Sequence, residues 1–206
     1  MTGEVIQRSD ARDNRLRILA VARAAFATDG LDVPIREIAR RTGVGPATVY
    51  RHFPTKEALF AEAFAESMTL CSQIVEDGLA DPDPWRGFSA VVERLLEMHS
   101  VDRGFSRAFT SRFPEAAAYF TSDRDRTLRS MVRLIRKAQD AGDLRPDFVL
   151  EDVILAMMAN EGIRADSVPA RTAATRRLAA FLLQSFRAEP SAAPLPPAAR
   201  LPISAR

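Results

Sequence analysis

The chain has 206 residues and a net charge of +2, with 47% hydrophobic and 27% charged residues, enough apolar material for one large or two small domains. A single cysteine excludes an internal disulfide, and no run approaches the roughly 20 apolar residues of a membrane-spanning helix. The N-terminus is charged where a signal peptide would be apolar, so we expect a cytoplasmic protein with no membrane partner.

Apolar residues recur with helical spacing along the chain, and no alternating strand pattern of useful length interrupts them. We therefore predict an all-α fold with three short helices followed by about six longer ones. Gly, Pro and Thr residues that stop or start helices divide the first part of the chain, and helices are expected at about 12–28, 34–42, 46–53 and 55–76.

A turn-rich segment, "DGLADPDP" at 77–84, separates these helices from the rest. Beyond it the same periodicity predicts helices at about 85–99, 103–112, 114–141, 153–159 and 171–186. The last 18 residues contain five prolines and little to bury, which is typical of a flexible tail.

The segment "RTGVGPATVYRHFPTKEAL", residues 40–58, joins two short helices through a glycine-containing turn. This arrangement is typical of a helix-turn-helix, whose second helix enters the major groove of DNA. Small residues at its start would let the backbone approach base edges, and longer donors behind them would reach phosphates. The candidate DNA-binding residues are Arg36, Pro46, Ala47, Thr48, Tyr50, Arg51, His52 and Lys56.

Charge supports the same interpretation. Residues 1–56 carry ten Lys and Arg against six Asp and Glu, a local charge of +4 that leaves −2 for the remainder. A basic N-terminal third is compatible with a phosphate-facing surface, although such runs often only solvate a face. A helix-turn-helix shape can also be a mere packing corner, but four donors on one short exposed element favour DNA contact.

The stretch "ILAVARAAFATDGLDVPIREIARRTGVGPATVYRHFPTKEALFAEAF", residues 18–64, resembles the N-terminal domain of the TetR/AcrR family of bacterial transcriptional repressors. The resemblance implies a homodimer, a palindromic double-stranded DNA operator and a variable C-terminal ligand domain. It places Arg36, Pro46, Ala47, Thr48, Tyr50, His52 and Lys56 at the DNA. Pro34 and Gly45 stand where many members have a Thr or Ser cap, and Pro46 replaces a more usual polar residue, so the base preference there is open.

We accordingly divide the chain into four parts. Residues 1–12 form a flexible N-terminal arm, and 13–60 form the helix-turn-helix domain. Residues 61–187 form a ligand-binding and dimerisation domain, and 188–206 form a flexible Pro/Ala-rich tail. The fourth helix begins at the DNA side with Lys56 and runs about 30 Å into the larger domain, so an effector that displaces its far end would change the spacing of the two DNA-reading heads.

Two apolar helices are candidates for an intersubunit four-helix bundle. One contains "VILAMMA" at 153–159, apolar on all sides, and the other carries an apolar stripe near the C-terminus. The alternative is that both belong to the core of one chain. The expected dimer residues are Val153, Met157, Leu178, Phe181, Leu182 and Phe186.

Aromatic and methionine side chains are candidates for the wall of a pocket for a small apolar or aromatic effector, because both types repack around varied ligands. Ordinary core is the alternative for each of them. The candidates are Met68, Phe105, Phe109, Phe113, Phe120, Met131 and Met157. We interpret Cys71 as a buried structural residue and His99 as a helix-end residue.

Enzyme function is the main alternative class. Two histidines, one cysteine, no Gly-rich phosphate loop and no metal-ligand spacing argue against it. We therefore expect no catalytic residue, no metal and no cofactor. Two further alternatives remain open: a larger domain that only dimerises or binds a protein partner, and an activator in place of a repressor.

Overall fold

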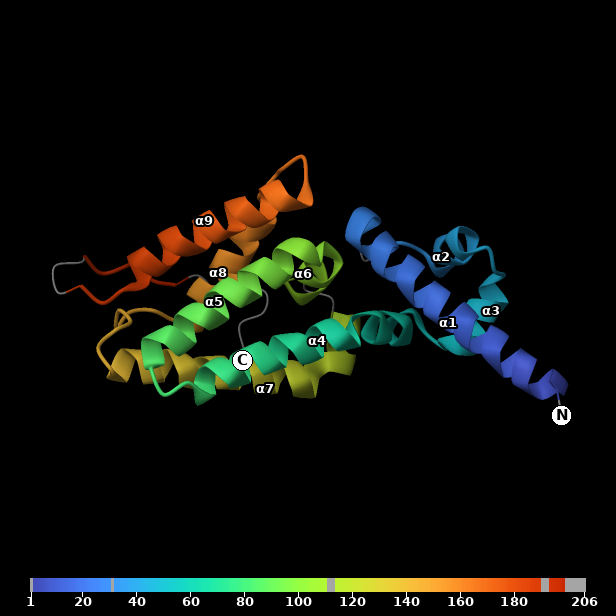
Figure 1. Ribbon diagram of the computed structural model, residues 1–206, viewed down its shortest axis with the longest axis horizontal. Helices are drawn as coiled ribbons and strands as arrows, with labels where there is room; N and C mark the ends of the chain where they lie inside the picture. The colour runs from blue at the N-terminus through green and yellow to red at the C-terminus, as the bar shows by residue number, and fades with distance from the viewer. Residues whose placement is uncertain (1, 31, 111–113, 190–192, 199–206) are drawn as a thin grey trace.

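The computed structural model describes residues 2–30, 32–110, 114–189 and 193–198, and within these ranges the chain is all-α, as predicted. Helices α1–α3 form a smaller lobe, and α4–α9 form a larger one (Figure 1). None of the helices in these ranges is long and apolar enough to cross a bilayer. The helices are α1 Thr2–Asp29, α2 Ile35–Thr42, α3 Pro46–His52, α4 Lys56–Ala80, α5 Pro84–Val101, α6 Arg103–Thr110, α7 Pro114–Asp140, α8 Leu150–Glu161 and α9 Val168–Phe186.

Helix α1 begins about ten residues earlier than expected. The segment predicted to be a flexible arm, 1–12, is helical from Thr2 onward. Gly3 is the least favourable helix former there and no proline interrupts the segment, and extending a helix that is already nucleated costs little. Further along α1, the buried residues Ile18, Ala22 and Phe26 follow one helical face and pack in the core.

The larger lobe is layered. Helix α4 packs along α7 on one side, α5 lies in the middle, and α8 and α9 cover the other side of α5 (Figure 1). Helices α4 and α5 cross closely, because Gly78 and Gly87 face each other: a Cβ on either would overlap the carbonyl oxygen of the other. Lys137 of α7 donates to the carbonyl oxygens of Leu79 (3.2 Å) and Asp81 (2.5 Å), which anchors the end of α4 far from the smaller lobe.

The described part of the C-terminal tail is attached to the body. Arg145 donates to the carbonyl oxygen of Ala193 (3.0 Å), and the Leu195 amide donates to the carboxylate of Asp147 (2.7 Å). The tail was expected to be flexible because it has little apolar surface. Over 193–198 these polar contacts to the α7–α8 loop hold it instead.

Candidate nucleic-acid interface and internal cavity

The turn between α2 and α3 is built on Gly43, which has a positive φ of 76°. Its amide donates to the carbonyl oxygen of Arg40 (3.2 Å), and the Val44 amide donates to that of Ala39 (3.1 Å). This pair of bonds is the Schellman motif, which ends a helix on a left-handed residue and favours glycine there. The turn thereby fixes the angle at which α3 leaves α2.

Helix α3 packs on the core through one face and exposes the opposite face to solvent. Val49 within it and Phe53 directly after it are buried at 0% and 1% exposure. Because both point into the core, the opposite face of α3 is turned to solvent. Most of the predicted DNA contacts lie on α3 and are open to solvent. Thr48 is half-buried, and Arg36, on α2, is exposed. The exposed residues of α3 are Pro46, Ala47, Tyr50 and Arg51.

Neither short helix has a side-chain N-cap. Pro34 and Gly45 occupy the two cap positions, and neither contributes a side-chain hydrogen bond. By contrast, Thr55 caps α4 as predicted, accepting from the Ala58 amide at 3.1 Å. The departure from the usual Thr or Ser caps therefore leaves the helix-turn-helix geometry intact.

The cations on and next to α2 and α3 fall into two groups. Arg40 and Arg41 are held by carboxylates: Arg40 Nε lies 2.8 Å from Glu37, and Arg41 Nη1 lies 2.5 Å from Asp29. Hydrogen bonds from the two arginines lower the pKa of Glu37 to about 2, so this carboxylate stays ionised.

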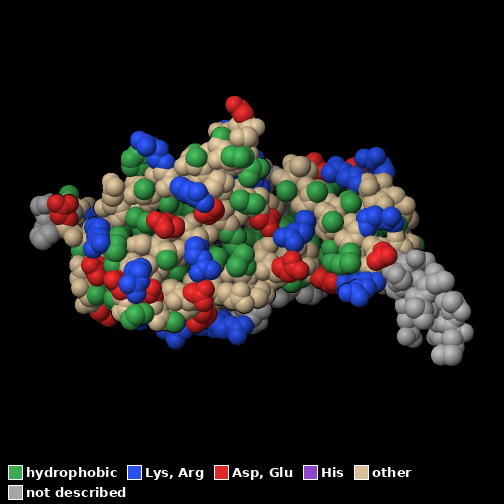
Figure 2. Space-filling view, in the orientation of Figure 1, with side chains coloured by type: hydrophobic (Ala, Val, Ile, Leu, Met, Phe, Trp, Pro, Cys, Tyr) green, Lys and Arg blue, Asp and Glu red, His purple; other side chains and the backbone are tan. Residues whose placement is uncertain are grey.

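Arg36, Arg51 and Lys56 form the second group, with no acidic partner among the described residues. Figure 2 shows Lys and Arg side chains on the visible surface of the smaller lobe. Un-neutralised cations beside an exposed short helix have the chemistry to bind phosphates. The arrangement suits a DNA backbone on either side of α3.

His52 differs from the other candidates. Its Nε2 is buried and has no hydrogen-bond partner among the described residues, and burial together with Arg51 and Arg15 lowers the pKa of the imidazole. The ring is therefore neutral at pH 7. A neutral imidazole binds phosphate less strongly than a cation does, so His52 is a weaker candidate for a phosphate contact than Arg51 or Lys56.

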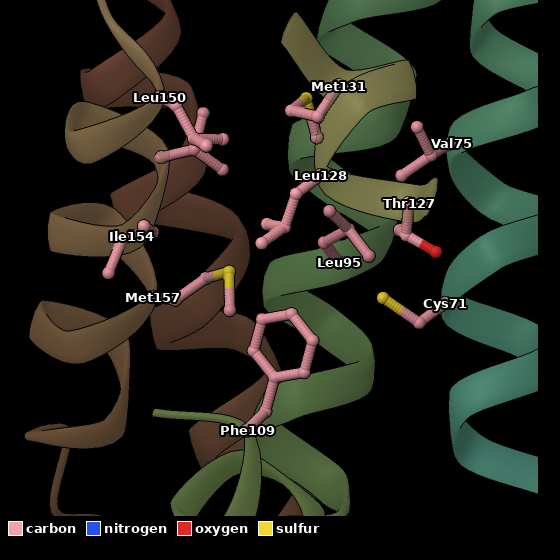
Figure 3. Close-up of a pocket in the computed structure, with 11 residues that line it drawn as sticks. Cys71, Val75, Leu95, Phe109, Thr127, Leu128, Met131, Leu150, Ile154 and Met157 are labelled. Atoms are coloured by element: carbon pink, nitrogen blue, oxygen red, sulfur yellow. The ribbon is translucent and has the colours of Figure 1, made fainter. Parts of the chain in front are cut away.

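An internal cavity lies in the larger lobe, between α4, α5, α6, α7 and α8 (Figure 3). The cavity has a volume of about 20 Å³, which is room for roughly one water molecule. Its walls carry no charged side chain. The lining residues are Cys71, Val75, Leu95, Phe109, Thr127, Leu128, Met131, Leu150, Val153, Ile154 and Met157.

Three of the seven predicted pocket residues, Phe109, Met131 and Met157, line this cavity. Met68 and Phe105 do not, which corrects the expectation: Met68 lies one turn nearer the smaller lobe, and Phe105 packs against Phe64 and His99. Spacing along a helix could not show which turn faces the cavity. Phe113 and the side chain of Phe120 lie outside the described residues.

Cys71 was predicted to be buried but was not included among the pocket residues; its thiol points into the cavity (Figure 3). Its position on the same α4 stripe as Met68 and Val75 was the available signal. Burial raises the pKa of the thiol to about 12, so it remains protonated. The hydroxyl of Thr127 is already engaged with the hydroxyl of Ser72 at 2.7 Å.

The predicted dimer residues divide into two sets. Val153 and Met157 line the cavity, and Phe186 is buried against Phe88 and Phe148. These three belong to the core of one chain, which corrects the expectation. Phe181 is 55% exposed, and Leu178 and Leu182 are half-buried beside it.

On α8 the outward face carries Leu155 and Met158, which the prediction did not include. They are 56% and 38% exposed, large values for apolar side chains of this size. Phe181 on α9 is likewise an exposed apolar side chain. We call these three residues the α8–α9 apolar surface.

The part of the chain that the structure describes contains no group of three His, Cys, Asp or Glu residues placed to hold a metal ion.

Two family models match the chain. The model described as "Bacterial regulatory proteins, tetR family" matches residues 18–63, and "Transcriptional regulator SbtR-like, C-terminal domain" matches residues 83–188. Both describe transcriptional regulators and not enzymes.

Individual relatives agree with these matches. An HTH-type transcriptional regulator of Staphylococcus aureus (strain USA300) is 40% identical over 53 residues, which are 25% of this chain and 29% of the relative. A TetR transcriptional regulator of Streptomyces coelicolor is 28% identical, with a TM-score of 0.52 over 84% of this chain and 98% of the other. A ketosteroid transcriptional regulator of Mycobacterium tuberculosis, 18% identical over 85% of this chain and 95% of the other, has a TM-score of 0.67 and shares the fold.

Proposed function

Because the chain belongs to the TetR family of bacterial transcriptional regulators, we propose that it is a DNA-binding repressor released from its operator by a small, mainly apolar effector. As a homodimer it binds a palindromic operator, with one α3 in each of two successive major grooves. Tyr50, Arg51 and Lys56 grip phosphates, and Ala47, Thr48 and Arg36 reach base edges.

One observation carries the proposal: α4 is a single helix that joins the DNA-facing lobe to the cavity. It begins at Lys56 and supplies Cys71 and Val75 to the cavity wall. At 1.5 Å per residue, Lys56 and Cys71 are about 22 Å apart along the helix. A change at the cavity wall is therefore transmitted to the DNA side by a continuous element.

The size of the cavity supports a conformational response. Room for about one water molecule cannot hold an effector of drug-like size, so a ligand must push the cavity walls apart. Since α4 is one of those walls, binding prefers a state in which α4 is displaced. The ligand then weakens DNA binding to the extent of that preference, and DNA weakens ligand binding by the same factor.

A homodimer supplies the second reading head. The α8–α9 apolar surface, with Leu178 and Leu182 at its edge, is the part of the larger lobe suited to pair with its own copy. Two helices from each chain would form a four-helix bundle around a two-fold axis. The α3 helices would then lie about 34 to 36 Å apart, one turn of DNA.

Gel shifts with DNA from upstream of its own gene, with and without small molecules, test the proposal. We expect a protein–DNA complex that an effector dissociates, and an effector affinity that falls when operator is saturating. A ligand that binds equally well to the free and the operator-bound protein would rule out release by this route. Selection and sequencing of the DNA fragments that the protein retains identifies the operator and shows whether it is palindromic.

The same assays separate the remaining alternatives. A reporter gene whose expression falls when the protein is removed would identify an activator. A protein that binds DNA and dimerises, but shows no heat of binding with any effector candidate and retains a partner protein, would instead have a larger lobe for dimerisation or protein binding.

A further inference from the structure

His99, in the last turn of α5, is a buried polar residue without a role in the fold described so far. It is 1% exposed, and neither Nδ1 nor Nε2 has a hydrogen-bond partner among the described residues. Leaving a buried donor and acceptor unpaired is costly, and most buried polar groups in proteins are paired. The two unpaired ring nitrogens of His99 therefore suggest that a hydrogen-bonding group of a ligand binds there.

The imidazole lies directly behind one wall of the cavity. Its ring centroid is 5.5 Å from that of Phe109, in an edge-to-face arrangement, and 5.3 Å from that of Phe105. Phe109 lines the cavity, and its ring points toward Met157 (Figure 3). A rotation of the Phe109 side chain would open the cavity onto His99.

The nearest carboxylate does not engage His99. Asp102 accepts hydrogen bonds from Arg23 (3.0 Å), from the Ser67 hydroxyl (2.7 Å) and from the Phe105 amide (3.0 Å). Burial lowers the pKa of His99 to about 4, so the ring is neutral at pH 7. A neutral imidazole offers one N–H donor and one acceptor nitrogen, which matches a hydroxyl or a carbonyl group.

On this basis, and resting on the ligand-responsive function proposed above, we infer that the cavity takes an uncharged, apolar ligand bearing one hydroxyl or carbonyl group, which His99 binds after the ligand displaces Phe109. The apolar body lies among Leu128, Met131 and Ile154. Its polar end points toward the junction of α5 and α6.

An ionised ligand fits less well. The lining residues carry no charge, and burying an unpaired charge is far more costly than burying a hydroxyl. Arg124 lies over the Phe109 ring, with its Cζ 6.0 Å from the ring centroid, but it is half-buried and has a further interaction within the protein. His99 is the neighbour of Phe109 whose hydrogen-bonding groups are open.

Three probes with one ring system test this assignment on the full-length protein: naphthalene, 2-naphthol and 2-naphthoate, measured by calorimetry at pH 7.5. The neutral hydroxyl of 2-naphthol can pair with His99, so we expect it to bind about three- to tenfold more tightly than naphthalene. The ionised 2-naphthoate should bind more weakly than both.

His99→Leu keeps a side chain of similar size and removes the ring nitrogens. We expect it to abolish the preference for 2-naphthol over naphthalene while naphthalene affinity changes by less than twofold. Ser89→Ala is the matched control, because Ser89 is also on α5 and its hydroxyl is also buried without a partner among the described residues, whereas only His99 of the two is in ring contact with Phe109 of the cavity wall. That variant should keep the wild-type preference.

A preference for 2-naphthoate, an unchanged ratio in His99→Leu, or no binding of any probe at its solubility limit would overturn the inference. These results are separable from the regulatory role. Operator release by another ligand, with no dependence on His99, would leave the proposed function standing and the ligand class wrong. Binding of 2-naphthol through His99 without any effect on operator binding would support the site and contradict the function.

Discussion

Arg36, Arg51 and Lys56 differ from Arg40 and Arg41, because no carboxylate among the described residues is paired with them. Arg40 and Arg41, which the sequence presents as equally basic, are tied to Glu37 and Asp29. Net charge along the sequence therefore overstates the number of cations open to DNA. Only side-chain placement shows which ones remain.

Lys56→Ala is expected to weaken binding to all DNA sequences alike and to lower the slope of log affinity against log salt by about 1, because the contact proposed for Lys56 is to a phosphate. Arg36→Ala should instead cost roughly 1 to 3 kcal/mol at the operator and relax one base position. Fluorescence anisotropy at several salt concentrations measures both. Arg94→Ala, on the larger lobe, is the control and should change neither quantity.

His99 gives the protein a pH-dependent stability of known sign. Its pKa is about 4 in the folded state against 6.5 normally, so between these values the unfolded chain binds more protons. Folding stability is therefore complete above pH 6.5 and falls on acidification, by on the order of 2 kcal/mol between pH 7 and pH 5. Urea unfolding of the wild type and of His99→Leu at both pH values measures the difference.

The loss between pH 7 and pH 5 should be smaller in His99→Leu by that amount. His52, whose pKa is also lowered, is present in both proteins, so its contribution cancels. Equal losses in the two proteins would mean that His99 is protonated or solvated in the folded state.

Among the elements, the helices of the smaller lobe were predictable because Gly43, Pro34, Pro46 and Thr55 mark their ends by local chemistry. The early start of α1 was not predictable, since residues 2–11 carry neither a cap nor an apolar stripe. Stops and starts that depend on one or two residues can be read from sequence. Those that depend on helix extension cannot.

The sequence could not predict which face of α8 is buried, for a different reason. "VILAMMA" is apolar all round, so its periodicity does not distinguish the cavity face, with Val153 and Met157, from the outward face, with Leu155 and Met158. The faces are assigned only by the helices packed against α8. The burial of Phe186 was also unpredictable from its own helix, because the rings that cover it, Phe88 and Phe148, come from elements distant in sequence.

The α4–α5 crossing makes a specific demand on Gly87. In Gly87→Ala the new methyl group would overlap the backbone oxygen of Gly78, and backbone cannot move aside as a side chain can. We expect a loss of about 3 kcal/mol in the free energy of unfolding, measured by urea denaturation. Gly45→Ala is the control for steric overlap: no atom lies within 4 Å of the new Cβ, so it should cost only the weaker N-cap of α3, about 1 kcal/mol or less. A tolerated Gly87→Ala would show that the two helices are farther apart.

For the whole molecule, the proposed homodimer depends on the α8–α9 apolar surface. Phe181→Glu places a charge at its centre and should convert the dimer to a monomer in sedimentation at micromolar concentration. Operator affinity should fall at least tenfold, since one reading head is lost. Val101→Glu, at a 60% exposed apolar residue on α5, is the control and should remain dimeric. A dimeric Phe181→Glu would place the interface elsewhere.

The close contact of Gly78 with Gly87, reinforced by Lys137, makes one end of α4 a fulcrum. Cys71 lies about 10 Å along the helix from Gly78, and Lys56 lies about 33 Å from it. If α4 moves as a rigid lever, a displacement of 1 Å beside the Cys71 thiol becomes about 3 Å of travel at Lys56, the proposed phosphate contact. A cavity wall that yields by about 1 Å would then shift each of the two proposed DNA-reading helices by about 3 Å relative to its groove.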